Sequence, residues 1–353
     1  MHTFVRLLAV FIVLILASEL FVRSVLTLPV SSIPDTELGW VYKPYATILH
    51  ASEGRAVNQM NSMGFNDDDP DVNSGRTRIL VMGDSVTMAL QVPRSENFTS
   101  VAEVIAPCLD VFNTGRTGLS PVHYPIVLFR ITKHFMPALA VVVITSGDMS
   151  DMMSGYYAII RNQTDKRIIG LRVKEKPLSR LRIMLDPVLS RSALATYLVY
   201  RLNALRINKH KGDPAMEEAD PVGADDEYIH ELMVHLFSSM NMKVPVAILY
   251  IQRLSYDVGK VAAVDKRSGE FERLVRDAAH EARVPFLSTE SYMKASYRKN
   301  GQPGVGFPNK NITGGHLNSL GHKATALALI DLAVDAGLQC GSDDRASGKQ
   351  TQQ

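Results

Sequence analysis

From residue 78 onward, the sequence alternates short apolar runs with longer stretches of helical periodicity. The apolar runs, which we interpret as strands, cover residues 79–82, 109–112, 138–144, 244–251 and 285–287. The helical stretches cover residues 97–105, 122–134, 227–241, 270–282 and 319–336. Strands that alternate with helices favour a parallel sheet with helices packed on both faces. We therefore predict an α/β fold: a three-layer α/β/α sandwich around a mainly parallel five-stranded sheet.

A long connection separates the third and fourth predicted strands. It has about 100 residues, whereas a simple crossover needs only a dozen or so. We therefore predict a helical insert at about 152–243. Within it, an amphipathic stretch at 179–206 follows several lysines and arginines. This stretch is either an ordinary helix with a solvated face or a lid that contacts anionic lipid headgroups or acidic glycans.

The first 22 residues contain an apolar segment, 4–22, that approaches the roughly 20 residues needed to cross a bilayer. It is either a cleaved signal peptide or an uncleaved anchor. The cleavage pattern around Ala17 is poor and apolar residues continue beyond it, which favours an anchor. Arg6 and Arg23 flank the segment on opposite sides, so the positive-inside rule does not set its orientation.

These patterns divide the chain into four parts. Residues 1–28 are predicted to form the transmembrane signal anchor, and residues 29–77 an extended lead-in that wraps the domain. Residues 78–340 form the α/β domain with its insert. The polar residues 341–353 are predicted to be a disordered tail.

Charge and cysteine content exclude several classes of function. The net charge is only +2, and no Lys/Arg run is interleaved with aromatic residues, so we do not expect a nucleic-acid partner. No cluster of His, Cys and carboxylate residues has the spacing of metal ligands, so we expect no metal. Cys108 and Cys340 are the only cysteines, and they form either one disulfide or two free thiols.

Polar turns that contain glycine follow the first three predicted strands, whose carboxyl ends meet at one edge of a parallel sheet. Ser85 follows the first strand, and a serine there becomes a nucleophile if a base and oxyanion donors are within reach. Gly118 follows the second strand, and Gly147 and Asp148 follow the third. His316 lies in a loop just before the last predicted helix and is the candidate base.

In this order, the motifs resemble the SGNH (GDSL-type) hydrolase family, specifically its bacterial branch with an N-terminal membrane segment. The resemblance spans most of the chain and is carried by residues 61–65, 78–85, 92–98, 113–118 and 316–322. It implies an SGNH/flavodoxin-like fold in which Ser85 attacks an ester carbonyl and His316 removes its proton. It also implies that the backbone N–H groups of Ser85 and Gly118 donate to the oxyanion. Such chemistry requires no cofactor.

Two positions depart from the family pattern. The third family motif is Gly-Asn-Asp, and the gapless match places Gly147 where the asparagine side chain would donate to the oxyanion. Loss of such a donor typically lowers the rate by about 10²–10³. The family also has an aspartate shortly before the histidine, where this chain has Thr313 and Gly314. A backbone carbonyl, or a carboxylate from elsewhere in the chain, is then needed to orient His316.

Two classes of function follow from these observations. The first is an ester hydrolase, or an acyl transferase with the same chemistry, that acts on acyl esters of glycans or lipids. The second is a catalytically degenerate protein of the same fold that binds an envelope glycan or a protein partner. A flavodoxin-like binding protein ranks below both, because no phosphate loop follows the first strand. With a membrane anchor, we expect the domain on the extracytoplasmic side, periplasmic or at the cell surface.

Overall fold

The centre of the molecule is a parallel β-sheet. The computed structural model describes residues 2–25, 32–35, 37–71, 73–153, 157–161, 168–173, 192–195, 197–198, 226–256 and 263–339. Within these residues, the sheet has the order β13 (Phe286–Ser288), β10 (Val246–Ile251), β7 (Leu139–Thr145), β5 (Thr77–Met82) and β6 (Leu109–Asn113). All four strand pairings are parallel. Numbered along the chain, this is the 2-1-3-4-5 order of flavodoxin-like sheets, as expected from the sequence.

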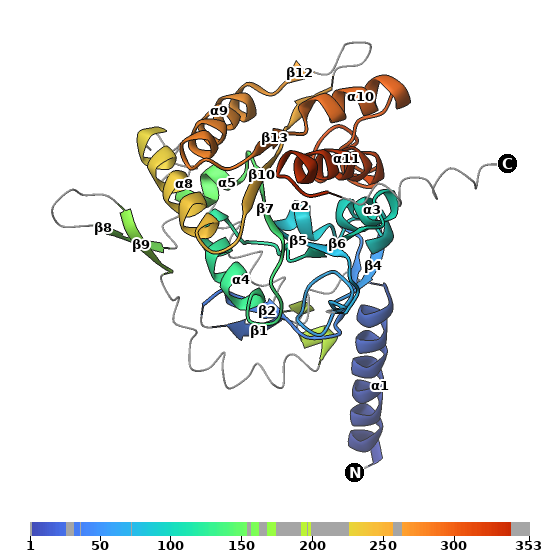
Figure 1. Ribbon diagram of the computed structural model, residues 1–353. Coiled ribbons are helices and arrows are strands. Elements are labelled where there is room, and N and C mark those ends of the chain that lie inside the picture. The colour runs from blue at the N-terminus through green and yellow to red at the C-terminus, as the bar shows by residue number, and fades with distance from the viewer. Residues whose placement is uncertain are drawn as a thin grey trace, which may run out of the picture.

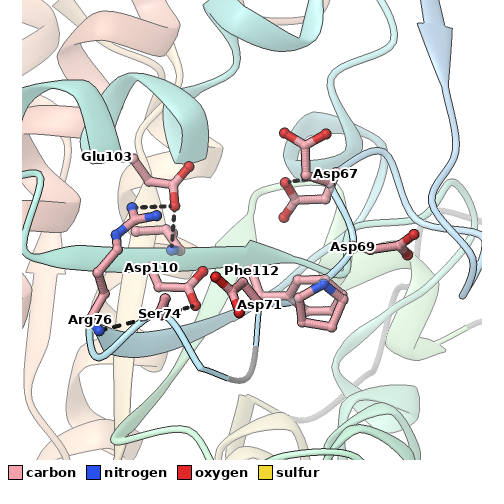
Figure 2. Close-up of a pocket in the computed structure, with 11 residues that line it drawn as sticks. Asp67, Asp69, Asp71, Ser74, Arg76, Glu103, Asp110 and Phe112 are labelled. Carbon is pink, nitrogen blue, oxygen red and sulfur yellow. Dashed lines mark hydrogen bonds and ion pairs between the residues drawn. The ribbon is translucent and has the colours of Figure 1, made fainter.

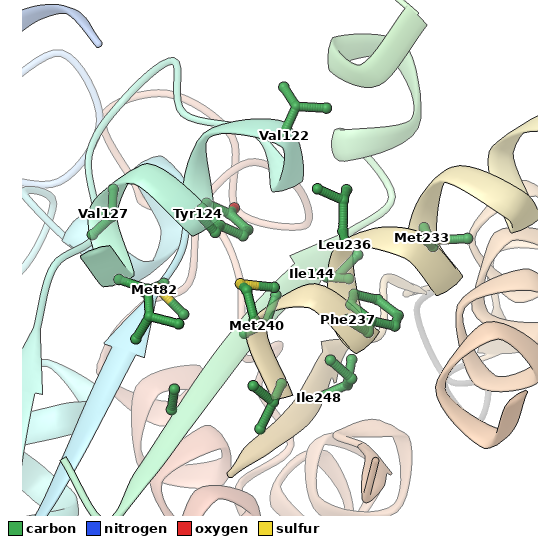
Figure 3. Packing of buried hydrophobic residues seen from close by; sticks show 14 of the residues in the cluster. Met82, Val122, Tyr124, Val127, Ile144, Met233, Leu236, Phe237, Met240 and Ile248 are labelled. Atoms are coloured by element: carbon green, nitrogen blue, oxygen red, sulfur yellow. The ribbon is translucent and has the colours of Figure 1, made fainter. Parts of the chain in front are cut away.

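Both faces of the sheet are buried, which explains why its strands are apolar throughout rather than alternating. Successive side chains of a strand point to opposite faces. In β5, Leu80 and Met82 therefore face one core, and Ile79 and Val81 face the other. Figure 3 shows the first of these cores, where Met82 lies among side chains from helices α4 and α8.

Helices cover the sheet on each side, giving the three predicted layers (Figure 1). On one side lie α4 (Tyr124–Ile131), α8 (Asp226–Asn241) and α9 (Lys266–Glu281). On the other lie α3 (Phe98–Ile105), α10 (Glu290–Asn300) and α11 (Ser319–Asp335). The prediction of a three-layer α/β/α fold is confirmed, with strand and helix ends within a few residues of those expected. Helix α10 was not predicted.

The lead-in before β5 contains two β-hairpins, although its sequence predicted only extended chain. Strands β1 (Ser32–Asp35) and β2 (Gly39–Tyr42) are antiparallel, as are β3 (Thr47–His50) and β4 (Ala56–Gln59). Arg116, from the turn after β6, holds the first hairpin through hydrogen bonds to the carbonyls of Leu38 and Trp40. Asn58 holds the second by donating to the carbonyls of Leu90 and Val92. The lead-in is thus packed onto the domain at both hairpins.

Short elements complete the described structure. The helices α2 (Ser85–Met88) and α5 (Asp148–Met153) follow β5 and β7, and the 3₁₀ turns η1 (Arg94–Glu96) and η2 (Pro121–His123) precede α3 and α4. Strands β11 (Leu254–Ser255) and β12 (Ala263–Val264) form a small antiparallel pair.

The start of the predicted helical insert differs from expectation. It contains an antiparallel hairpin of β8 (Tyr157–Arg161) and β9 (Ile168–Val173). Of the amphipathic stretch 179–206, residues 192–195 and 197–198 are described, and residues 193–195 and 197–198 are helical. The tail, 341–353, and Cys340 lie outside the described residues. Cys108 is disulfide-bonded.

The N-terminal apolar segment forms helix α1 (His2–Val25), which projects from the rest of the molecule (Figure 1). Residues Thr3–Arg23 are long and apolar enough to cross a membrane, and almost all of them are exposed. Helix α1 is therefore a candidate membrane span.

Candidate active site

The candidate nucleophile, Ser85, is the first residue of α2, directly after the buried strand β5. The Asp84 carboxylate caps this helix by accepting a hydrogen bond from the Val86 N–H at 2.8 Å. Strand β5 lies between β6 and β7, at the point where the strand order reverses. Open α/β sheets bind their ligands at this switch point, beyond the carboxyl ends of the strands. The sheet therefore presents Ser85 where a substrate is expected to bind.

His316 reaches Ser85 from the loop before α11. Its Nε2 lies 3.0 Å from Ser85 Oγ, which is within hydrogen-bonding distance. Asn318 fixes the loop: its side-chain oxygen accepts bonds from the first N–H groups of α11, and its amide donates to carbonyls of the facing segment 303–306. The nucleophile and base predicted from the sequence are thus brought together.

The other histidine of this motif, His322, is not part of the site. It is buried and stacked against the ring of Phe98. Burial, with a smaller contribution from His316, lowers the pKa of His322 to about 3. The ring is therefore neutral near pH 7, and its Nδ1 accepts a hydrogen bond from the Phe98 N–H. His322 has a packing role.

The group that orients His316 is Glu53, in the loop between β3 and β4. Glu53 Oε2 lies 2.8 Å from His316 Nδ1, and Glu53 Oε1 accepts a hydrogen bond from the His316 backbone N–H at 2.7 Å. One carboxylate therefore holds both the ring and the backbone of the histidine. The sequence indicated only that such a carboxylate had to come from elsewhere, because Thr313 and Gly314 occupy the usual positions.

The environment of Glu53 keeps it ionised. The residue is 2% exposed, and burial on its own would raise the pKa of its carboxyl. Hydrogen bonds from the backbone and ring of His316, and from Lys310 at 3.1 Å, outweigh burial and lower the pKa to about 2. Near pH 7 the carboxylate is therefore charged, so it can accept a hydrogen bond from the N–H of His316 Nδ1 and stabilise an imidazolium at that position.

The loop that carries Glu53 is fixed by Asn309. The Asn309 side chain accepts from the Gly54 N–H at 2.9 Å and donates to the carbonyls of Ala51 and Gly54 at 3.0 and 2.9 Å. The Glu53 loop is thereby tied to the segment that leads to His316.

Gly315 allows the close approach between the two segments. Its φ is +100°, and a Cβ built there would lie 2.0 Å from Glu53 Oε1. Any other residue would collide with the carboxylate, so glycine at 315 is a structural requirement of the Glu53 contact.

The predicted oxyanion positions lie on the turns that follow the strands next to β5. Gly118, after β6, is exposed and has a φ of +79°. Gly147, after β7, is also exposed, and a Cβ built there would meet only Thr145 Oγ1, at 3.5 Å. Asp148 is buried, and its carboxylate accepts a hydrogen bond from the Thr145 N–H at 2.7 Å. The Asp148 side chain thus supports the turn that presents Gly147.

An acidic cavity of about 400 Å³ lies at the outer edge of the sheet, beside β6 (Figure 2). Neither Ser85 nor His316 lines it. The buried Asp67 contributes to it, and burial raises the pKa of Asp67 well above its usual value. The carboxylate accepts hydrogen bonds from the N–H groups of Asn113 and Asp68. Asp67 therefore supports the turn after β6. In the part of the chain that the structure describes, no group of three or more His, Cys, Asp or Glu residues is arranged to hold a metal ion.

The sheet order, the position of Ser85 and its contact with His316 are those implied by the motif resemblance. The chain therefore has the flavodoxin-like three-layer α/β/α fold that this resemblance implies. No protein-family model and no curated protein matches the sequence.

The solved structures similar to this chain include several esterases. A catalytic mutant of an acetylxylan esterase from Geobacillus stearothermophilus is 13% identical, with a TM-score of 0.41, and the match covers 76% of this chain and 98% of that one. A lipolytic G-D-S-L family member from Veillonella parvula is 11% identical, with a TM-score of 0.40 and coverage of 72% and 96%. A carbohydrate acetylesterase from Sinorhizobium meliloti is 11% identical, with a TM-score of 0.38 and coverage of 74% and 100%.

Proposed function

We propose that this protein cleaves acyl esters with a catalytic triad of Ser85, His316 and Glu53. The observation that carries the proposal is the position of the His316 ring, with Nε2 3.0 Å from Ser85 Oγ and Nδ1 2.8 Å from Glu53 Oε2. Serine hydrolases activate their nucleophile with this arrangement: the imidazole lies between the serine hydroxyl and a carboxylate and is hydrogen-bonded to both.

The first half of the reaction forms an acyl-enzyme. Ser85 Oγ attacks the ester carbonyl carbon while its proton passes to His316 Nε2, and the carbonyl oxygen becomes an oxyanion. Glu53 accepts a hydrogen bond from the Nδ1–H of the resulting imidazolium and stabilises its charge. The tetrahedral intermediate then expels the alcohol, which takes the proton from His316 Nε2. The products of this half are a free alcohol and an ester between the acyl group and Ser85.

The second half regenerates the enzyme. A water molecule, or a sugar hydroxyl in the case of acyl transfer, attacks the acyl-enzyme as His316 removes its proton. Collapse of the second tetrahedral intermediate returns the proton to Ser85 and releases the acid or the new ester. The proton balance closes within the triad, so these steps need no metal or organic cofactor.

Oxyanion stabilisation in this proposal comes from backbone groups. Ser85 is the first residue of α2, where N–H groups have no partner within the helix. Together with the N–H of Gly118, the Ser85 N–H would donate to the oxyanion. Gly147 offers no side-chain donor, so we expect catalysis to be about 10²–10³ slower than with an asparagine there.

The substrates we propose are acyl esters of glycans or lipids, reached from a membrane surface. Helix α1 would anchor the protein, with the catalytic domain on the extracytoplasmic side. The alternative, a catalytically degenerate binding protein, was suggested partly by the missing acid next to His316. Glu53 supplies a carboxylate beside His316 Nδ1, which favours the ester hydrolase over the binding protein.

The proposal is tested with the full chain in detergent micelles, a fluorophosphonate probe and a short-chain nitrophenyl ester. We expect labelling and turnover in the wild type, and a fall of more than about 10³ in kcat/KM in both Ser85→Ala and His316→Ala. Ser62→Ala, which changes an exposed serine away from the site, should behave like the wild type. A folded wild type that neither labels nor turns over the ester would support the binding protein instead.

A further inference from the structure

Helix α1 carries a carboxylate inside its apolar surface. Large apolar side chains are exposed on both sides of Glu19, with Leu16 63% and Leu20 66% exposed. The candidate span ends at Arg23, one helical turn or about 6 Å further along the axis. Glu19 therefore lies within the apolar part of the span, close to its domain-side end.

Glu19 is held by a segment that is distant in the sequence. Its carboxylate accepts hydrogen bonds from Ser192 Oγ at 2.9 Å and from the backbone N–H groups of Ala193 and Leu194, each at 2.8 Å. It also forms an ion pair with Arg23 at 2.7 Å. These donors come from the first turn of the short helical stretch in the insert.

The contact of Glu19 with Ser192, Ala193 and Leu194 matters because α1 is a candidate membrane span. An ionised carboxylate in or near hydrocarbon is costly unless donors satisfy it, and intramembrane charges are therefore almost always paired. The donors on Ser192, Ala193 and Leu194 must lie at the depth of Glu19 to make these bonds. Since Leu20 and Phe21 follow Glu19 as exposed apolar residues, that depth is the boundary between hydrocarbon and headgroups.

We propose that residues 192–195 and 197–198 of the insert lie in the interfacial layer of the lipid bilayer, docked against α1 through Glu19. Leu198 is 51% exposed and would face lipid. Tyr197 is partly buried, and tyrosine is enriched at membrane interfaces. The partner of this surface is the bilayer itself. The proposal does not depend on the esterase function.

Fluorescence quenching by nitroxide lipids tests this placement. The full chain is placed in nanodiscs of phosphatidylcholine and phosphatidylglycerol that contain a lipid with the nitroxide just below the headgroup. An environment-sensitive fluorophore is attached under non-reducing conditions to Leu198→Cys or, as the control, to Lys299→Cys. Lys299 is an exposed residue of α10, on the opposite side of the domain from α1 (Figure 1). We expect at least threefold stronger quenching at position 198.

Variants at position 19 test the docking. Glu19→Leu removes both acceptor oxygens and keeps α1 apolar, so it should reduce quenching at position 198 to the level at position 299. Glu19→Gln keeps one acceptor and should give an intermediate value. Equal quenching at positions 198 and 299 in the wild-type background would overturn the interfacial placement, whatever the variants do. Unchanged quenching in Glu19→Leu would overturn the role of Glu19.

Discussion

Glu53 and His316 are 263 positions apart in the sequence, yet the Glu53 carboxylate binds both the ring and the backbone N–H of His316. The two residues come from the lead-in hairpin and from the loop before α11. This contact distinguishes the site from the family pattern, in which the acid precedes the histidine by two or three residues. Most of the expected behaviour of the proposed triad follows from it.

Glu53→Gln should impair catalysis more than substrate binding. The amide keeps the shape of the side chain but cannot stabilise the His316 imidazolium, so we expect kcat to fall by about 10²–10⁴ with little change in KM. Steady-state kinetics on a nitrophenyl ester measure both constants. Glu37→Gln is the matched control, because Glu37 also lies in the lead-in but pairs with Arg130. A kcat within threefold of the wild type would remove Glu53 from the triad.

The contribution of Glu53 to stability should depend on pH with a defined sign. Its pKa is about 2 in the folded protein, against an ordinary value of 4.5. A lowered folded-state pKa stabilises the fold above about pH 4.5, and this stabilisation is lost as the pH falls towards 2. The difference in thermal midpoint between wild type and Glu53→Gln should therefore shrink over this range. A constant difference between pH 7 and pH 2.5 would contradict the assignment.

Gly315→Ala should disrupt the site through one collision. The new methyl group would lie 2.0 Å from Glu53 Oε1, so the carboxylate has to move away from His316. We expect kcat to fall by at least about 10², as for loss of the acid. Gly301→Ala is the control, since Gly301 also has a positive φ but has open space around its Cβ position. We expect Gly301→Ala to keep the wild-type kcat, and an equal kcat in Gly315→Ala would contradict the collision with Glu53.

Gly147→Asn should make the enzyme faster. A Cβ at position 147 has an ordinary contact with Thr145 Oγ1, so the larger side chain can be accommodated. If its amide reaches the oxyanion, kcat rises by up to about 10²–10³. Comparison with Gly147→Ala, which adds a side chain without a donor, isolates the effect of the amide. An asparagine variant no faster than the alanine variant would show that no oxyanion forms beside position 147.

The sheet was predictable because its strands are buried on both faces and stand out as apolar runs. Helix α10 was missed because its only buried residue is Met293, so it has no apolar stripe. The hairpins β3–β4 and β8–β9 were missed for a related reason. Their strands are short and lie outside the central sheet, so their apolar residues form no pattern that differs from that of a loop. Long apolar elements are thus far easier to predict from sequence than short half-exposed ones.

The pairing of Ser85 with His316 could be predicted because each residue lies in a local motif next to a predictable element. Glu53 could not, since its role depends on a contact between two loops that only the folded chain brings together. The signal that pointed to it was indirect: Thr313 and Gly314 leave the usual place of the acid without a carboxylate. Gly315 gave no signal of its own, because its neighbour Glu53 was unknown.

The hairpin that carries Glu53 lies between the end of α1 at Val25 and the start of β5 at Thr77. A protease that cuts between α1 and β1 would therefore release the domain from α1 with Glu53 still attached to it. A cut between β4 and β5 would instead leave Ser85 and His316 on one fragment and Glu53 on the other. Release of the domain from α1 and separation of the proposed triad are thus different outcomes, and the position of a single cleavage within this stretch decides between them.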